Sequence, residues 1–160
     1  MLSIGLFDVL GPDEPVGSGI PIRFEPPGLL WVYGLGWQPS TQAYLAKLAA
    51  AVKPGMSVLD FGTGSGILAI AAAKLGASHV VAVENNAEIA AYAKRQFELN
   101  GVDVELVETL PDTETFDVIV GNLSGTKAEI AAAHARAKAA GQTATPEIEL
   151  WEPKLRFRLK

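Results

Sequence analysis

The sequence predicts an α/β fold in which helices cover both faces of a mostly parallel sheet, forming a three-layer sandwich. Three observations carry this prediction. Strand and helix patterns alternate with short links between residues 57 and 107, two strand patterns are continuous apolar runs, and a glycine-rich turn joins the first strand to a helix. The 160 residues fit a single domain, and an apolar fraction of 49% is sufficient for a hydrophobic core.

The first part of the chain is predicted to be the least regular. Residues 1–30 are rich in glycine and proline, so we expect an irregular lead-in with up to two short strands, one of them near residues 20–24. A loop rich in glycine and aromatic residues follows. Apolar positions then recur at helical spacing, which predicts a helix that is capped by Ser40 or Thr41 and runs to about Val52.

The alternating segment contains most of the predicted sheet. Strands are predicted at residues 57–61, 79–83, 102–107 and 116–120, and helices at residues 66–75 and 87–100. Short links between these elements imply right-handed crossovers and therefore parallel strands. Asn85 or Asn86 is expected to open the second helix, and Gly101 to close it.

The last part of the chain predicts one more helix and two more strands. A capping box from Thr126 to Glu129 predicts a helix over residues 127–140, and a fifth strand is expected at residues 147–151. Apolar and basic side chains alternate over residues 154–160, which is typical of an edge strand with one solvated face. Contact with nucleic acid is the alternative interpretation of these basic residues.

Composition excludes several classes of function. The chain has no cysteine and only two histidines, His79 and His134, so we expect no disulfide, no thiolate chemistry and no metal site. A net charge of −5 without a long basic run argues against a broad nucleic-acid footprint. No segment is apolar enough to span a membrane, and the first residues lack the basic start of a signal peptide, so a cytoplasmic location is expected.

The glycine-rich turn is the main functional signal. Asp60 ends the first strand of the alternating segment, and Gly62, Gly64 and Gly66 follow at alternate positions. Such a turn lets the backbone approach a nucleotide-like ligand, and the helix start offers free N–H groups. Nicotinamide-dependent dehydrogenases prefer the third glycine one place later and have no acid at the strand end, so this class is disfavoured. The acid suits S-adenosylmethionine, because Asp60 can attract its ammonium group directly or through water.

A second acid lies at the position expected for ribose recognition. Glu84 lies 22 residues beyond Gly62, at the end of the next predicted strand. A carboxylate there can accept hydrogen bonds from both ribose hydroxyls. The alternative is an ordinary acid near a helix start that balances the helix dipole. The register of the turn, Asp60 and Glu84 favours binding of S-adenosylmethionine.

Residues 33–41, 59–77 and 118–123 form three blocks that resemble the bacterial ribosomal-protein lysine methyltransferases, the family that modifies the stalk-base protein of the large ribosomal subunit. The resemblance covers residues from about 22 to 125. It implies a Rossmann-like class I methyltransferase fold and N-methylation of a protein or small-molecule amine. A complete class I core has seven strands. Five or six are predicted here, so we expect a core shortened at the C-terminus, without the family's separate N-terminal recognition domain.

The resemblance also implies site residues. Gly34, Gly36 and Thr41 would lie near the methionine end of the cofactor, although Leu35 and Gln38 replace the threonine and histidine that are usual in that loop. Near the adenine, Glu108-Thr109-Leu110 stands where the family has a small-acidic pair, so the resemblance implies an adenine contact from either Glu108 or the backbone of Thr109. The predicted cofactor contacts are Gly34, Thr41, Asp60, Gly62, Thr63, Gly64, Gly66, Glu84, Asn85, Glu108, Thr109 and Asn122.

Asn122 is the one predicted catalytic residue. An amine must arrive neutral to attack the methyl group, and an amide carbonyl after the fourth strand could accept an amine hydrogen and aim the lone pair. The alternative is a turn residue that simply follows a strand. Trp31, Tyr33 and Trp37 could wall the methyl pocket or serve as lid or core aromatics.

Two hypotheses of different class remain open at this stage. The first is an S-adenosylmethionine-dependent methyltransferase that acts on an amine. The second is a cofactor-binding module, or a degenerate methyltransferase, that has no activity of its own. A sheet edge left apolar by missing strands would also allow a homodimer.

Overall fold

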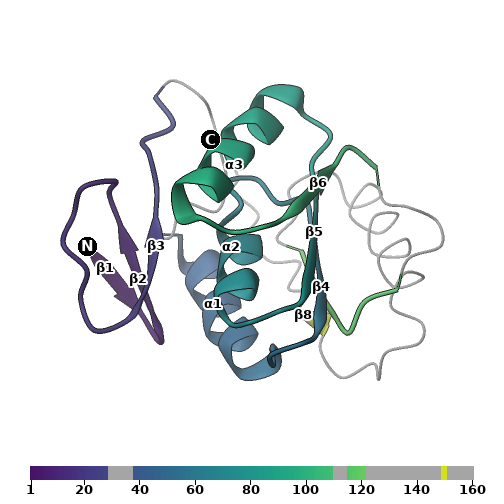
Figure 1. The fold of residues 1–160 in the computed structure, drawn as a ribbon, viewed down its shortest axis with the longest axis horizontal. Coiled ribbons are helices and arrows are strands. Elements are labelled where there is room, and N and C mark those ends of the chain that lie inside the picture. The colour runs from purple at the N-terminus through teal and green to yellow at the C-terminus, as the bar shows by residue number, and fades with distance from the viewer. Residues whose placement is uncertain (29–37, 110–114, 122–148, 151–160) are drawn as a thin grey trace, which may run out of the picture.

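The described residues form a central parallel sheet of five strands (Figure 1). The computed structural model describes residues 1–28, 38–109, 115–121 and 149–150. The strands of this sheet are β4 (Ser57–Phe61), β5 (His79–Val83), β6 (Glu105–Val107), β7 (Val118–Val120) and β8 (Glu149–Leu150). They lie in the order β6-β5-β4-β7-β8, and every neighbouring pair is parallel. The predicted parallel sheet is therefore confirmed.

The chain changes direction across this sheet at β4. From β4 it moves outward through β5 to β6, and β7 then pairs with the opposite edge of β4. In open parallel sheets, ligands bind outside the carboxyl ends of the strands at such a switch point. Asp60 of β4 is in register with Ala82 of β5 and with Val120 of β7. The residues that follow Asp60 therefore enter the edge where a ligand is expected.

Three described helices cover one face of the sheet (Figure 1). They are α1 (Pro39–Ala51), α2 (Ile67–Lys74) and α3 (Ala87–Asn100). Val58 and Val80 point into the core that these helices share, whereas Leu59 and Val81 lie in a second apolar cluster with Phe116. Burial on both faces explains why the strand patterns are continuous apolar runs. Among the described residues, no helix is long and apolar enough to cross a membrane.

The start of α1 differs from the prediction. The helix begins at Pro39 behind Gln38, and neither Ser40 nor Thr41 is the capping residue. Proline is favoured at the first helical position, because its fixed φ suits the helix and its missing N–H would have had no helical partner there. Because Pro39 occupies the first helical position, the helix begins two to three residues earlier than a cap at Ser40 or Thr41 predicts.

The ends of α3 confirm the prediction and resolve one alternative. Asn86 is the capping residue, and its Oδ1 accepts hydrogen bonds from the N–H groups of Glu88 and Ile89 at 3.0 and 3.2 Å. Asn85 precedes the cap. The helix ends at Gly101, whose φ of +61° is the left-handed conformation that glycine tolerates.

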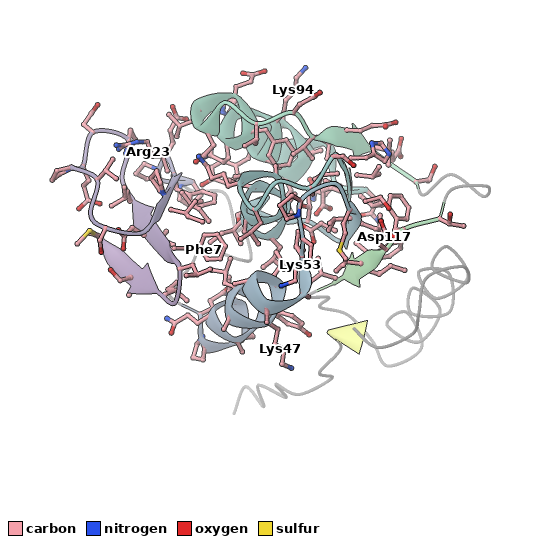
Figure 2. The ribbon with its side chains drawn as sticks, turned by 60° about the horizontal axis from the view of Figure 1, so that its bottom comes forward. Phe7, Arg23, Lys47, Lys53, Lys94 and Asp117 are labelled. Atoms are coloured by element: carbon pink, nitrogen blue, oxygen red, sulfur yellow. The ribbon has the colours of Figure 1, made fainter. Side chains whose placement is uncertain are left out.

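The first 23 residues form a second, three-stranded sheet. Its strands are β1 (Leu2–Ile4), β2 (Phe7–Leu10) and β3 (Ile20–Arg23), in the order β1-β2-β3. The strand near residues 20–24 was predicted, but the segment is more regular than the expected lead-in. The sequence did not show this regularity, because strands of three and four residues are too short to display an alternating pattern. Phe7 and Ile22 pack into the same core as Leu45 of α1, so this sheet lies on the helices (Figures 1 and 2).

Two predicted elements cannot be compared with the structure. The helix expected over residues 127–140 and the edge strand expected over residues 154–160 lie outside the described residues. The fifth predicted strand is described at Glu149–Leu150 alone, where β8 pairs with β7.

Candidate functional site

The turn after β4 is built from glycine backbone. Gly62, Gly64 and Gly66 have φ values of +77°, +56° and +84°, which other residues rarely adopt. The N–H groups of Gly62 and Thr63 both donate to the carbonyl oxygen of Val83 at the end of β5, each at 2.9 Å. The turn therefore lies against the carboxyl ends of two neighbouring strands, where the sequence predicted it.

Phe97 of α3 contacts the turn directly. A Cβ atom on Gly66 would stand only 2.5 Å from Cε1 of Phe97, so no side chain fits at Gly66 without movement of the ring. Gly66 is also the residue that caps α2. Sequence reasoning did not single out Phe97, since a helical pattern predicts which face is buried but not which side chain meets the turn.

Asp60 is buried beneath the turn and is 1% exposed. Its Oδ2 accepts hydrogen bonds from Oγ1 of Thr63 at 2.6 Å and from the N–H of Ala69 at 3.1 Å. The N–H of Ala69 belongs to the first turn of α2, whose donors have no partner inside the helix. Asp60, at the end of β4, therefore accepts a hydrogen bond from one of the free donors at the start of α2, a structural role that the sequence did not reveal.

The second oxygen of Asp60 is in a different position. Oδ1 is buried and has no hydrogen-bond partner among the described residues. Burial, helped by the nearby charge of Glu84, raises the pKa of Asp60 to about 6, although the hydrogen bonds from Thr63 and Ala69 act to lower it. An unpaired oxygen on a buried carboxylate is costly, so a cationic group placed next to it would be strongly stabilising. This chemistry fits an ammonium group.

Glu84 joins the turn to the start of α3. Its Oε2 accepts a hydrogen bond from the N–H of Gly64 at 3.2 Å, and its Oε1 accepts one from the N–H of Asn86 at 3.1 Å. The side chain is half-buried. The geometry supports both interpretations of Glu84, as a ligand-binding acid and as an acid that balances a helix dipole. One of its oxygens contacts the glycine-rich turn, and the other lies at the positive end of α3.

The other predicted residues of this edge lie beside Glu84. The N–H of Glu84 donates to the carbonyl oxygen of Val107 at 3.0 Å, and Glu108 and Thr109 follow Val107 directly. Glu108, Thr109 and Asn85 have exposed side chains. The structure thus brings these three predicted residues to the same edge of the sheet as the turn.

Three predicted residues are not brought into this cluster by the described contacts. Thr41 is buried in the first turn of α1, and its Oγ1 donates to Oε1 of Gln38 at 3.4 Å. Gly34 and Asn122 lie outside the described residues, as do the aromatic residues between 31 and 37. Their roles stay predictions.

Comparison with known proteins gives a family. The family model described as ribosomal protein L11 methyltransferase (PrmA) matches residues 13–140 of the chain. A curated ribosomal protein L11 methyltransferase from Methylobacillus flagellatus is 43% identical over 132 residues, which cover 81% of this chain and 43% of that protein. The chain spans less than half the length of this and other curated relatives that it matches.

Solved structures share the fold. A crystal structure of a ribosomal protein L11 methylase from Lactobacillus delbrueckii subsp. bulgaricus is similar with a TM-score of 0.72 and 32% identity, and covers 86% of this chain and 72% of that one. The T. thermophilus 16S rRNA N2 G1207 methyltransferase, solved with AdoMet and guanosine, has a TM-score of 0.60 and 26% identity over 68% of this chain and 33% of its own.

The matched region contains the glycine turn, Glu84 and the whole of α3. The resemblance seen in the sequence is therefore confirmed, and so is the Rossmann-like methyltransferase fold. The chain belongs to the ribosomal protein L11 methyltransferase family.

Proposed function

We propose that the chain binds S-adenosylmethionine at the carboxyl ends of β4 and β5 and uses it to methylate an amine of a protein. The observation that carries this proposal is the buried Oδ1 of Asp60, which has no hydrogen-bond partner within the described part of the chain and lies beneath a turn whose three glycines have positive φ. A dinucleotide brings a pyrophosphate to this place, which an acid would repel, whereas S-adenosylmethionine brings an ammonium group and a sulfonium.

Each part of the cofactor has matching groups at this edge. Asp60 would receive the ammonium group. Glu84 would receive the ribose hydroxyls, and its present hydrogen bonds to the N–H groups of Gly64 and Asn86 support this role, because they hold the carboxylate beside the turn. Glu108 and Thr109, which follow β6, are the candidates for the adenine end.

The cofactor supplies an activated methyl group on a sulfonium leaving group, so the protein has mainly to align the nucleophile. Gly121 is buried directly after β7, on the other side of the switch point from the turn, and Asn122 is the next residue in the sequence. We propose that the amide carbonyl of Asn122 accepts a hydrogen bond from an N–H of the neutral amine and thereby orients the nitrogen lone pair. The position of Gly121 supports this role.

Ribosomal protein L11 is the proposed substrate, because the relatives of the chain are named for methylation of that protein. A ribosomal substrate would place the reaction in the cytoplasm. A small-molecule amine is the alternative substrate, and a cofactor-binding module without activity is the alternative function. The predicted homodimer can be tested by light scattering in solution.

Two experiments separate these readings. Calorimetry with S-adenosylhomocysteine should give saturable binding, and calorimetry with NAD should give none; absence of heat with both S-adenosylhomocysteine and S-adenosylmethionine would contradict the proposal.

Transfer of a radiolabelled methyl group should then label purified ribosomal protein L11. Asn122→Ala should lose the label while it keeps its affinity for S-adenosylhomocysteine. If the chain binds S-adenosylhomocysteine but transfers no methyl group to L11 or to any component of a cell extract, the cofactor-binding module is the function.

A further inference from the structure

Side chains of α3 cover the outer edge of β3, where no other strand lies among the residues that the structure describes. Arg23 presents its backbone N–H and C=O to this edge. Oδ1 of Asn100 accepts a hydrogen bond from the N–H of Arg23 at 2.8 Å, and Nδ2 of Asn100 donates to the C=O of Arg23 at 2.7 Å. The next residue, Phe24, faces the other way, since its N–H donates to the C=O of Leu10 in β2 at 2.9 Å. One amide side chain thus pairs with Arg23 as a neighbouring strand would.

Two more residues of α3 hold Glu25 in the same manner. Oε1 of Gln96 accepts a hydrogen bond from the N–H of Glu25 at 2.9 Å, and the hydroxyl of Tyr92 donates to its C=O at 2.6 Å. Tyr92 and Gln96 are buried. Burial raises the pKa of Tyr92 to about 12, so its hydroxyl stays protonated and remains a donor. We call Tyr92, Gln96 and Asn100 the α3 ladder.

The spacing of the α3 ladder explains why it fits a strand. Its residues are four apart, which corresponds to a rise of about 6 Å along a helix. Alternate residues of an extended chain are about 6.6 Å apart, and Glu25 lies two residues beyond Arg23, the last residue of β3. A helix face that carries polar side chains at every fourth position can therefore reach the free groups of one strand edge. Both the N–H and the C=O of Arg23 and Glu25 are paired in this way.

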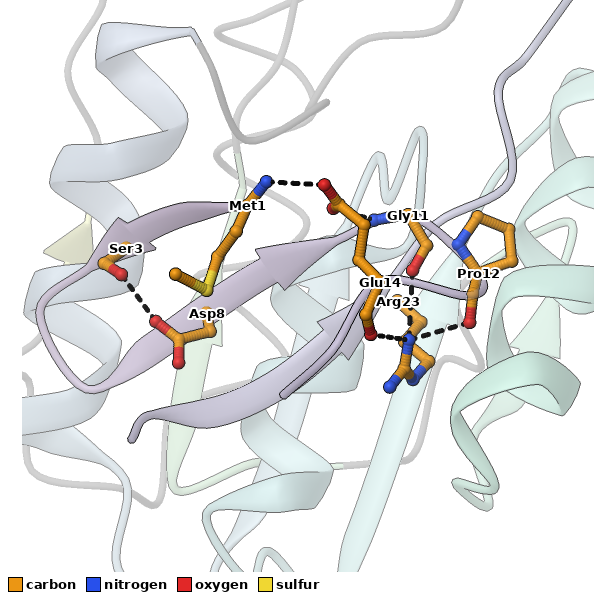
Figure 3. A network of polar contacts seen from close by, with 7 residues as sticks. All are labelled: Met1, Ser3, Asp8, Gly11, Pro12, Glu14 and Arg23. Carbon is orange, nitrogen blue, oxygen red and sulfur yellow. Dashed lines mark hydrogen bonds and ion pairs between the residues drawn. The ribbon is translucent and has the colours of Figure 1, made fainter. Parts of the chain in front are cut away.

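The strand that the ladder binds is itself fixed. On the side chain of Arg23, Nη1 donates to the carbonyl oxygens of Gly11, Pro12 and Glu14 at 3.1, 2.7 and 2.9 Å (Figure 3). These bonds tie β3 to the loop that follows β2. The strand that contacts α3 is therefore fixed within the N-terminal sheet by its own hydrogen bonds.

The same helix contacts the cofactor turn. Phe97, the residue after Gln96, packs on Gly66, and Asn86 at the start of α3 donates its N–H to Glu84. The helix is thus held between residues 23–25 and the turn. A shift of α3 away from the turn would change both the packing at Gly66 and the position of the Glu84 carboxylate.

We propose that the α3 ladder is a set of positioning residues, which sets the affinity of the turn for S-adenosylmethionine without contact with it. The inference rests on the proposed function. The ladder acts through Phe97 and Glu84, at the cofactor end of the site, whereas alignment of the amine is assigned to the end of β7. Loss of the ladder should therefore weaken cofactor binding and leave methyl transfer at saturating cofactor unchanged.

The test compares Tyr92→Phe, Asn100→Ala and the double variant with Lys94→Ala, which removes an exposed side chain from α3 (Figure 2). Affinity for S-adenosylhomocysteine is measured by calorimetry at a temperature at which circular dichroism shows every variant to be folded. The double variant should bind about tenfold more weakly than the wild type, and Lys94→Ala should bind equally well. Methyl transfer at saturating cofactor should be the same in all four.

A folded double variant that unfolds at lower urea but binds with wild-type affinity would overturn the inference, since the ladder would then only stabilise the fold. If the double variant does not fold, Tyr92→Phe carries the test, because it removes a single hydroxyl; wild-type affinity in that variant would overturn the inference. Absence of binding by the wild type is a different outcome, which would reject the proposed function itself.

Discussion

Two strand edges in this molecule are closed in opposite ways. The first, which we call the charged edge, is the side of the sheet where the carboxyl ends of β4 and β5 meet. There the carboxylates of Asp60 and Glu84 accept hydrogen bonds from backbone N–H groups, and one buried oxygen of Asp60 has no partner among the described residues. At the outer edge of β3, the neutral α3 ladder pairs every described N–H and C=O of Arg23 and Glu25. An edge that is fully paired supports the fold, whereas an edge with an unpaired buried charge is suited to a ligand.

The largest expected effect is at the contact between the turn and α3. Gly66→Ala places a Cβ atom 2.5 Å from Phe97 at a φ of +84°. The left-handed backbone costs about 1–2 kcal/mol and overpacking about 1–3 kcal/mol, so the free energy of unfolding in urea should fall by about 2–5 kcal/mol. Gly101→Ala is the matched control, because its φ is +61° and nothing lies within 4 Å of the added Cβ. Equal losses in the two variants would show that the contact with Phe97 does not matter.

The second effect depends on pH. The pKa of Asp60 is raised by burial from 3.8 to about 6, so the folded state holds this proton at pH values where the unfolded state has released it. The free energy of unfolding should therefore fall as pH rises from 4 to 6, by up to about 3 kcal/mol. Asp60→Asn lacks this contribution, and urea denaturation of both proteins across that range isolates it. Parallel pH profiles would contradict the burial of an ionisable Asp60.

A smaller effect is expected at Glu84. Glu84→Gln keeps one acceptor oxygen but loses the charge and the second acceptor, so affinity for S-adenosylhomocysteine should fall about tenfold while stability changes by less than about 1 kcal/mol. Calorimetry and urea denaturation measure the two quantities. Glu88→Gln, at an exposed acid in the first turn of α3, is the control and should bind normally. A similar loss in both variants would mean that Glu84 acts only through the helix dipole.

The smallest effect is expected on the stability of the ladder edge. Tyr92→Phe removes the donor to the C=O of Glu25, which should lower the free energy of unfolding by about 1 kcal/mol in urea. Stability equal to that of the wild type would show that the buried carbonyl finds another partner. It would contradict the claim that the α3 ladder stabilises the fold at the outer edge of β3.

The sequence revealed the charged edge because its signals are local. Three glycines at alternate positions, Asp60 before them and Glu84 at the next strand end can each be placed by counting along the chain. Short apolar strand patterns likewise placed β4 and β5 to the residue. The bond from Asp60 to the N–H of Ala69 was not predicted, because sequence spacing does not reveal which donors of a helix start a buried carboxylate will reach.

The neutral edge was not predictable in the same way. Tyr92, Gln96 and Asn100 are polar or amphipathic residues on a helix, and their partners lie about 70 residues earlier in the chain. Nothing in their spacing distinguishes them from a solvated face. Beyond the strand near residues 20–24, the sequence allowed one more short strand in this region but did not locate β1 or β2, since both are short and gain their order from packing on the helices.

The central claim is that the charged edge, and not the neutral one, binds the cofactor. The most direct measurement is a titration of the ¹⁵N-labelled chain with S-adenosylhomocysteine, followed by the amide resonances. We expect saturable shifts that are largest at Gly62, Gly64 and Asn86 and small at Leu2–Ile4 in β1. No shift at the turn, or larger shifts in the N-terminal sheet than at the turn, would contradict the central claim.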